Sequence, residues 1–267
     1  MNMRKHFAPV CLVLAAALTS LAHAAEPVKK TAEAHPSADA ILRQMSDTLG
    51  DARQFSFKGT REIASSLAAD KNLQRRSEFD IVVRRPNKLA VRSTSSEGLR
   101  RMIFDGQAFT MVDSQQNTYA TVALNASLDE LPAQLAKTYG FVPPMADFMQ
   151  SDPYQDFRRR AQAVSYLGLG TAGTPPEDCH RLALKGKLAD AELCVGTKSH
   201  LPLRMTARVK GGVDAGVDLK IEFGDWNLIA PVTDQTFAFT PAGRAQKIPM
   251  VTTSEIEAAM AKSGAKK

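Results

Sequence analysis

The sequence predicts an α+β domain: a curved antiparallel sheet of about ten strands, shaped as a half-barrel, with helices covering its concave face. Two observations predict this class. Long stretches alternate apolar and polar residues with a period of two and are separated by turn residues, which is typical of half-buried antiparallel strands. One helical insert, residues 127–160, interrupts these strands, and helices docked on one face of such a sheet bury that face.

The domain is expected to begin with a helix at residues 37–50. Ile41, Leu42, Met45 and Leu49 recur at helical spacing. Ser37 is the expected N-cap, and Gly50 is the expected C-terminal stop.

Strands are expected next, over residues 55–63, 73–86, 88–93 and 100–124. Their inward-facing positions include Phe57, Ile81, Val91 and Met111. Asp105-Gly106 supplies a two-residue hairpin turn, and residues 113–117 supply a looser one.

The insert is expected to form short helices. Ser127 and Glu130 have the spacing of a capping box, Gly140 is the expected stop, and a second helix is predicted near residues 145–150. Asp152 and Pro153 have the pattern of an N-cap and a first helical residue.

Strands are predicted again at residues 163–170, 179–186, 191–196, 201–210, 216–226 and 236–241. A helix follows at 252–264, so about four helices accompany the sheet. Gly168, Gly170 and Gly173 match the glycine spacing of a dinucleotide site, but that site needs a helix to begin at its last glycine. Because Pro175 and Pro176 forbid that helix, a glycine-rich hairpin turn is predicted instead.

The first 24 residues have the pattern of a secretory signal peptide: Arg4 and Lys5, an apolar run, and Ala22-His23-Ala24 as the cleavage site. Residues 25–36 are interpreted as a flexible leader, 37–250 as a single domain, and 251–267 as a C-terminal helix and basic tail. Because Cys11 lies inside the apolar run, no lipid anchor is expected. The protein is therefore predicted to be soluble and periplasmic.

Loss of the signal peptide lowers the formal charge from +6 to +4, because it carries two basic residues and no acidic one. This balance is compatible with contact to anionic lipid head groups. Nucleic acid is not an expected partner of an exported protein.

Cys179 and Cys194 are the cysteines that remain after cleavage, and an oxidising compartment favours a disulfide between them. The alternative is a zinc site that adds His180 and His200. Adjacent residues of a strand face opposite ways, so Cys179 and His180 are poorly placed to share a metal. The disulfide is favoured, and no metal is expected.

No motif of a known catalytic class is present: the sequence lacks a G-x-S-x-G elbow and an H-E-x-x-H pair. Asp147 and Asp152 are possible paired carboxylates, but the simpler interpretation is helix capping. The arginine pairs at 75–76, 84–85 and 100–101 and the run at 158–160 are expected on a solvated surface. No catalytic residue and no cofactor are predicted.

The insert combines apolar side chains with a Pro143-Pro144 break. Core packing is the ordinary interpretation. The functional interpretation is a movable lid over an apolar cavity, in which flexible methionines accommodate acyl chains. The ligand-binding candidates are then Leu135, Tyr139, Phe141, Met145, Phe148 and Met149 of the insert, facing Phe57, Ile81, Val91 and Met111 of the sheet.

Several segments, in order, resemble predicted periplasmic proteins grouped as a domain of unknown function (DUF2092). Among them are `VVRRPNKLAVRS`, `FDGQAFTMVDSQQNTYATV`, `YGFVPPMADFMQSDPY` and `LPLRMTARVK`, and the likeness runs from about Ala38 to Ile248. That family is similar in fold to LolA/LolB-type periplasmic lipoprotein carriers, which implies a LolA-like domain with a curved sheet around an apolar cavity closed by helices. The carriers keep an arginine that controls their lid, and none of the arginines here is matched to it.

The leading hypothesis is a periplasmic binding protein or carrier for an apolar ligand, a lipid or the acyl chains of a lipoprotein. The alternative is a non-enzymatic envelope sensor or scaffold, whose partner is an envelope protein or the membrane surface. A hydrolase is the third hypothesis. An open apolar volume inside the sheet favours the carrier, and a filled interior favours the scaffold.

Overall fold

The computed structural model describes residues 36–267 except 66–72, 213–214 and 265–267. The predicted signal peptide, the leader up to residue 35 and the end of the basic tail lie outside the described residues. None of the described helices is long and apolar enough to span a membrane.

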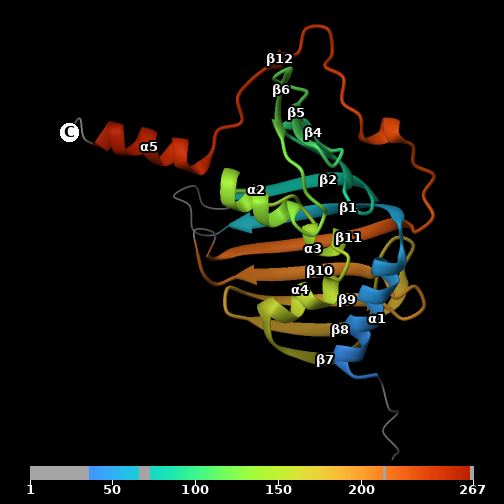
Figure 1. Cartoon of the computed structure of the whole chain (residues 1–267). Coiled ribbons are helices and arrows are strands. Elements are labelled where there is room, and N and C mark those ends of the chain that lie inside the picture. Colours follow the sequence, from blue (N-terminus) through green and yellow to red (C-terminus); the bar gives the residue numbers. More distant parts are fainter. Residues whose placement is uncertain (1–35, 66–72, 213–214, 265–267) are drawn as a thin grey trace, which may run out of the picture. The chain divides into compact units, whose positions relative to one another are not determined.

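The helices stand at the start, in the middle and at the end of the described chain (Figure 1). They are α1 (Ala38–Asp51), α2 (Leu131–Tyr139), α3 (Ala146–Met149), α4 (Pro153–Arg160), the 3₁₀ turn η1 (Asp234–Phe237) and α5 (Thr253–Gly264). The strands before the insert are β1 (Gln54–Ser65), β2 (Leu73–Arg84), β3 (Lys88–Ser95), β4 (Gly98–Phe104), β5 (Ala108–Asp113) and β6 (Thr118–Ala123). The strands after it are β7 (Ala161–Ala172), β8 (Glu177–Gly186), β9 (Ala189–Gly196), β10 (Pro202–Val209), β11 (Val217–Asn227) and β12 (Gln246–Lys247).

The twelve described strands form one sheet in the order β12-β6-β5-β4-β3-β2-β1-β11-β10-β9-β8-β7. Neighbours pair antiparallel except β12 and β6, which pair in parallel. β1 joins the halves, because it pairs with β2 on one side and with β11 on the other. The predicted α+β class with an antiparallel sheet is confirmed.

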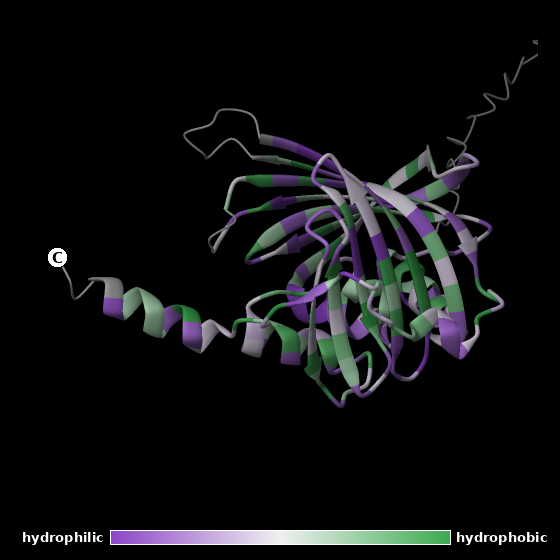
Figure 2. Cartoon of the chain, turned by 90° about the horizontal axis from the view of Figure 1, so that it is seen from above, coloured by the Kyte–Doolittle hydropathy of each residue, from purple (hydrophilic) through white to green (hydrophobic). Residues whose placement is uncertain are grey.

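One face of the sheet carries the apolar core, and helices α1, α3 and α4 lie against it (Figures 1 and 2). The side chains of Phe55, Phe57, Ile81 and Phe223 on this inner face are at most 1% exposed. The opposite, outer face carries the polar residues of the alternation, such as Glu62 and Lys220. The period-two pattern therefore decides which face the helices cover.

Helix α1 begins as predicted, because the Ser37 hydroxyl accepts a hydrogen bond from the Ala40 N–H at 3.1 Å. The prediction that Gly50 ends the helix is wrong, since α1 continues to Asp51. Gly50 serves close packing instead. A Cβ there would lie 2.8 Å from the Ser151 carbonyl oxygen, so only glycine lets the insert approach α1 this closely.

The insert forms its predicted helices with one shift. Ser127 and Glu130 make the reciprocal bonds of a capping box, but they close a turn, and α2 begins at Leu131, three residues after the start that a Ser127 N-cap predicts. Gly140 ends α2 in the left-handed region at φ 72°. Asp152 caps α4 by accepting from the Gln155 N–H at 3.1 Å, and Pro153 is the first helical residue.

The strand predicted at residues 236–241 is wrong, because this segment begins inside η1 and pairs with no strand of the described chain. Its alternation is real but has another cause. The Phe237 ring is buried beneath the Arg84 guanidinium, 5.1 Å from the ring centroid, and the Phe239 ring packs 5.1 Å from Tyr119. Because Phe237 and Phe239 are two residues apart and both rings pack against the domain, the segment has the alternation of a strand without its hydrogen-bond ladder.

A prediction follows from Gly59, at the centre of the β1 junction. A Cβ at this residue would lie 2.1 Å from the Glu222 carbonyl oxygen and 2.7 Å from the Phe79 ring. Gly59→Ala is expected to lower the free energy of unfolding by about 1–3 kcal/mol, as overpacking does. Urea unfolding measures this, with Gly243→Ala as the control, because a Cβ there meets nothing within 4 Å. Equal stability of the two variants would contradict the close approach.

Candidate functional site

The structure brings the ten predicted ligand-binding residues together in one apolar cluster between the sheet and the insert. Seven are at most 8% exposed: Phe57, Ile81, Val91, Leu135, Met145, Phe148 and Met149. Met111, Tyr139 and Phe141 are partly buried against them. The insert thus packs onto the inner face of the sheet and forms a cover, defined here as residues 127–160.

Aromatic rings fill the space beneath the cover. Phe57 stacks on Trp226 at 4.3 Å, and Phe148 of α3 meets Phe223 edge-on at 5.1 Å. Phe157 of α4 lies 5.5 Å from Phe148, which links the two cover helices to the same floor. In this conformation the centre of the predicted cavity is therefore occupied by side chains.

Three cavities stand out among the described residues, with volumes of about 890, 670 and 280 Å³. Of the ten predicted residues, Met111 alone lines one of them, the smallest, beside the segment 248–251. The two larger cavities are bordered mainly by outer-face side chains, and they share Glu62, Arg76 and Lys220. They form a shallow groove that the sequence analysis missed, although charged residues alternating along β1, β2 and β11 were its signal.

Arg85, directly after β2, reaches beneath the cover. Its guanidinium lies 5.2 Å from the centroid of the Phe55 ring, and its Nη2 donates to the Gln150 carbonyl at 2.5 Å. Its Nε and Nη1 are buried and have no hydrogen-bond partner among the described residues. Burial lowers the pKa of Arg85 below its ordinary value, and the charge of Asp129 offsets part of this effect. The expectation that both arginines of this pair are solvated is therefore wrong for Arg85.

Further polar contacts attach the cover to its surroundings. The Ser46 hydroxyl of α1 donates to Asp152 at 3.2 Å and accepts from the Tyr154 N–H at 2.9 Å. Within the cover itself, Asp129 accepts from the backbone N–H and the hydroxyl of Ser151 at 2.6 and 2.7 Å. These bonds lie around the apolar interior, so the cover is apolar inside and is held by polar groups at its rim.

An ion-pair cluster joins α3 to α4. Arg160 bonds to Asp147 at 2.5 Å and also to Asp156, which accepts a second bond from Arg159 at 2.7 Å. Burial raises the pKa of Asp147, the charge of Arg160 opposes this, and Asp156 adds to it. The capping interpretation is confirmed for Asp152 and wrong for Asp147, because Met145 occupies the N-cap of α3.

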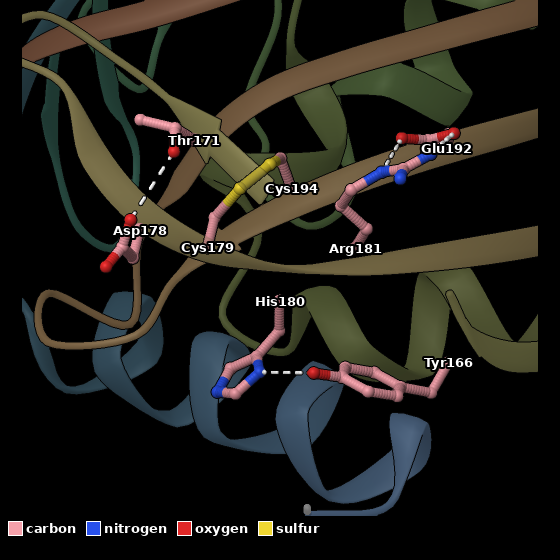
Figure 3. Close-up of a disulfide and its surroundings, with 8 residues drawn as sticks. All are labelled: Tyr166, Thr171, Asp178, Cys179, His180, Arg181, Glu192 and Cys194. Atoms are coloured by element: carbon pink, nitrogen blue, oxygen red, sulfur yellow. Dashed lines mark hydrogen bonds and ion pairs between the residues drawn. A yellow bond between two sulfur atoms is a disulfide. The ribbon is translucent and has the colours of Figure 1, made fainter. Parts of the chain in front are cut away.

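Cys179 and Cys194 form a disulfide across β8 and β9, with their Cα atoms 5.5 Å apart (Figure 3). His180 points away from the disulfide toward Tyr166, whose hydroxyl lies 3.3 Å from its Nδ1. His200 contacts the Gln44 amide at 3.1 Å. The four residues of the zinc alternative thus do not converge, and the described residues contain no cluster of three or more metal-ligating side chains.

The disulfide belongs to a small second core with Ala172 and Leu203. The glycine-rich segment is the predicted hairpin turn between β7 and β8. At the tip of this turn, Thr174 forms an isolated β-bridge with Gly224 of β11. The tip also lies close to Leu203, because a Cβ at Gly173 would be 3.2 Å from that side chain. The hairpin tip therefore folds over the outer face, and the disulfide lies beneath this fold.

These features define a class of protein: an open, mostly antiparallel sheet whose inner face is closed by a short helical cover. The family model described as "Predicted periplasmic protein (DUF2092)" matches residues 38–251. The chain belongs to this family, and the expected periplasmic location is confirmed.

Solved structures with similar chains were also found. One is the complex of MucA and MucB from Pseudomonas aeruginosa, at 17% identity and a TM-score of 0.42, covering 76% of this chain and 61% of that one. A second is a LolA superfamily protein from Nitrosomonas europaea, at 13% identity and a TM-score of 0.35, covering 77% of this chain and 99% of that one. A third is LprF from Mycobacterium bovis, at 10% identity and a TM-score of 0.42, covering 77% of this chain and 97% of that one. The chain thus spans about three fifths of the MucB structure. No curated protein sequence matches it.

A stability prediction follows from the disulfide. Replacing Cys179 and Cys194 together by alanine is expected to lower the free energy of unfolding by about 3 kcal/mol, because the unfolded chain loses a loop of 15 residues. Urea unfolding with and without reductant measures this, and the reduced natural protein should approach the double variant. Two free thiols in unfolded, unreduced periplasmic protein would contradict the bond.

The ion-pair cluster predicts a pH dependence. A carboxyl with a raised pKa binds its proton more readily in the folded state, so stability rises as the pH falls from neutral through the folded pKa. We expect acidification to raise the free energy of unfolding of the natural protein relative to Asp147→Asn. Asp47→Asn, on the exposed side of α1, is the control. An Asp147→Asn difference that stays constant with pH would contradict the raised pKa.

Proposed function

We propose that the protein binds an apolar ligand, a lipid or a lipoprotein acyl chain, between the inner face of the sheet and the cover. The observation that carries this proposal is Arg85. Two nitrogen atoms of its charged guanidinium are buried without a hydrogen-bond partner among the described residues, and they lie under a cover that packs apolar side chains onto the sheet. The closed form is thus destabilised by the desolvation of Arg85, and opening of the cover removes that desolvation.

The opposing energies are of similar size. Each buried donor without a partner costs about 1–3 kcal/mol, and water satisfies it when the cover opens. Each large apolar side chain that leaves the interior, such as Leu135 or Phe148, loses about 1.5–3 kcal/mol of burial. An acyl chain gains about 0.8 kcal/mol for each CH₂ group that it buries. This gain offsets the burial that the displaced side chains lose.

The cover has the composition that such exchange requires. Met145 and Met149 adapt to ligands of different shape, because their side chains are unbranched and flexible. Proline residues Pro143 and Pro144 separate α2 from α3, so the two parts of the cover are joined by a break in helical structure. We infer that α3 and α4 move together, because Arg160 ties them to each other.

A non-enzymatic role is part of this proposal. Asp152 is engaged as a helix cap, and Asp147 in an ion pair. The two histidines of the described chain contact Tyr166 and Gln44. The contacts of these side chains therefore stabilise the fold. A hydrolase instead needs a nucleophile within hydrogen-bond distance of its general base.

A second candidate is an envelope sensor or scaffold, and it is favoured by the filled interior. If the cover stays closed, the two larger cavities of the described residues are those of the outer face, where both are bordered by Glu62, Arg76 and Lys220. Such a protein recognises a partner on this charged groove and carries no apolar cargo.

Trp226 allows a direct test, because it is the only tryptophan and stacks on Phe57 beneath the cover. Titration with a fatty acid is expected to change Trp226 fluorescence as the stack separates. Arg85→Met removes the buried charge, so it should raise the thermal midpoint and weaken binding about fivefold by favouring the closed form. Arg92→Met, on exposed β3, is the matched control and should match the natural protein.

Native mass spectrometry of protein taken from its own envelope provides an independent measurement, and a co-purified lipid is expected. If no lipid co-purifies and fatty acid leaves Trp226 fluorescence unchanged, the carrier function fails and the scaffold function replaces it. If binding occurs but Arg85→Met binds as the natural protein does, Arg85 does not control the cover.

A further inference from the structure

A C-terminal segment, residues 246–253, runs from the β6 edge of the sheet to the end of α2 and is called the strap here (Figure 1). Its first residues form β12. The Gln246 N–H donates to the Asn117 carbonyl at 2.9 Å, and the Ile248 N–H donates to the Tyr119 carbonyl at 2.8 Å. These distances are those of regular backbone hydrogen bonds, so one end of the strap is fixed to the sheet.

The other end of the strap contacts the last turn of α2, which belongs to the cover. The Thr253 hydroxyl donates to the carbonyl oxygens of Lys137 and Thr138, which lie 3.3 and 3.4 Å away. Carbonyls in the last turn of a helix have no N–H partner within the helix, so an outside donor is favoured there. Gly140 leaves space for this contact, because a Cβ on it would lie 3.1 Å from the Thr253 methyl group. The strap thus joins the cover to the edge of the sheet.

Between its two ends, the strap lies beside the cover on the inner face of the sheet. The Phe141 ring of the cover packs 5.7 Å from the Phe109 ring of β5. Met111, two residues further along the same face of β5, borders the cavity of about 280 Å³ that the strap also lines. Met250 of the strap packs against the main apolar core. The strap therefore covers the side of the proposed ligand site at which Met111 lies.

We propose that the strap is a latch that holds the α2 end of the cover against the sheet and so limits access to the ligand site. This role rests on the proposed function, because it concerns the same cover. Pro143 and Pro144 separate α2 from α3, so α2 leaves the sheet while α3 and α4 stay in place. The strap ends are held by few hydrogen bonds, so the latch opens without unfolding of the sheet.

Hydrogen exchange of the α2 amides tests the latch without any ligand. Ile248→Pro removes the N–H that bonds to Tyr119, and Thr253→Val removes the hydroxyl at the other end of the strap. Each variant is expected to speed α2 exchange about two- to tenfold, the factor that one hydrogen bond contributes. Because both ends belong to one link, the double variant should exchange no faster than the faster single variant.

Two matched controls should leave α2 exchange unchanged. Ile248→Val keeps the N–H and most of the side chain. Thr48→Val removes a hydroxyl-to-carbonyl bond of 2.9 Å on α1, away from the strap. Exchange of the β8 amides reports opening of the whole domain and should be the same in every variant.

With a fatty acid present, both latch variants should also change Trp226 fluorescence faster, again by about two- to tenfold. Natural α2 exchange in Ile248→Pro and Thr253→Val overturns the proposal, as do additive effects in the double variant or an equal rise in β8 exchange. Fatty acid binding at the natural rate in both variants also overturns it. If α2 exchange rises but no fatty acid binds, the proposed function fails and the latch on the cover stands.

Discussion

The packing of the cover onto the aromatic floor of the sheet is the contact on which the rest of the structure depends. Phe57, Phe223 and Trp226 come from β1 and β11, and Phe148 closes on them from above. A sheet this long with one apolar face is not stable in water unless that face is covered. The cover supplies that burial, and its two anchors at α1 and at the end of β2 decide where it lies.

The same contact creates a conflict at Arg85. Closing the cover buries apolar rings, which is favourable, but it also encloses a guanidinium that finds one carbonyl and one nearby carboxylate. Proteins rarely keep an unsatisfied buried charge without a reason, because removing it usually stabilises them. In the proposed function this conflict reconciles a filled interior with ligand binding, because the closed form is then one of two states whose balance a ligand shifts.

The outer face has a different organisation. Cross-strand ion pairs such as Arg181 with Glu192 at 2.7 Å and Arg76 with Glu62 at 2.6 Å keep it solvated (Figure 3). At one corner it carries a small apolar core, where the β7–β8 hairpin tip folds over Leu203 and the disulfide. The disulfide gives β8 and β9 a covalent link near one end of the sheet, on the face opposite the cover. The sheet thus has one core on each face, of unequal size.

Local patterns of the sequence determined most of the elements: the period-two strands, the Ser37 and Asp152 caps, the Gly140 stop, the disulfide pair and the residues that form the interior. These features depend on neighbours within a few residues, or on the alternation that separates two faces. Only the tertiary structure decided the rest. Gly50 and the 236–241 segment were misassigned because their roles depend on Ser151, Arg84 and Tyr119, which are distant along the chain. Arg84 and Arg85 look equivalent in sequence, yet one pairs with Asp234 and the other is enclosed beneath the cover. Whether the interior is open or filled depends on how the side-chain volumes of β1, β11 and α3 fit together. A local sequence pattern cannot predict this fit, because the three elements are distant along the chain.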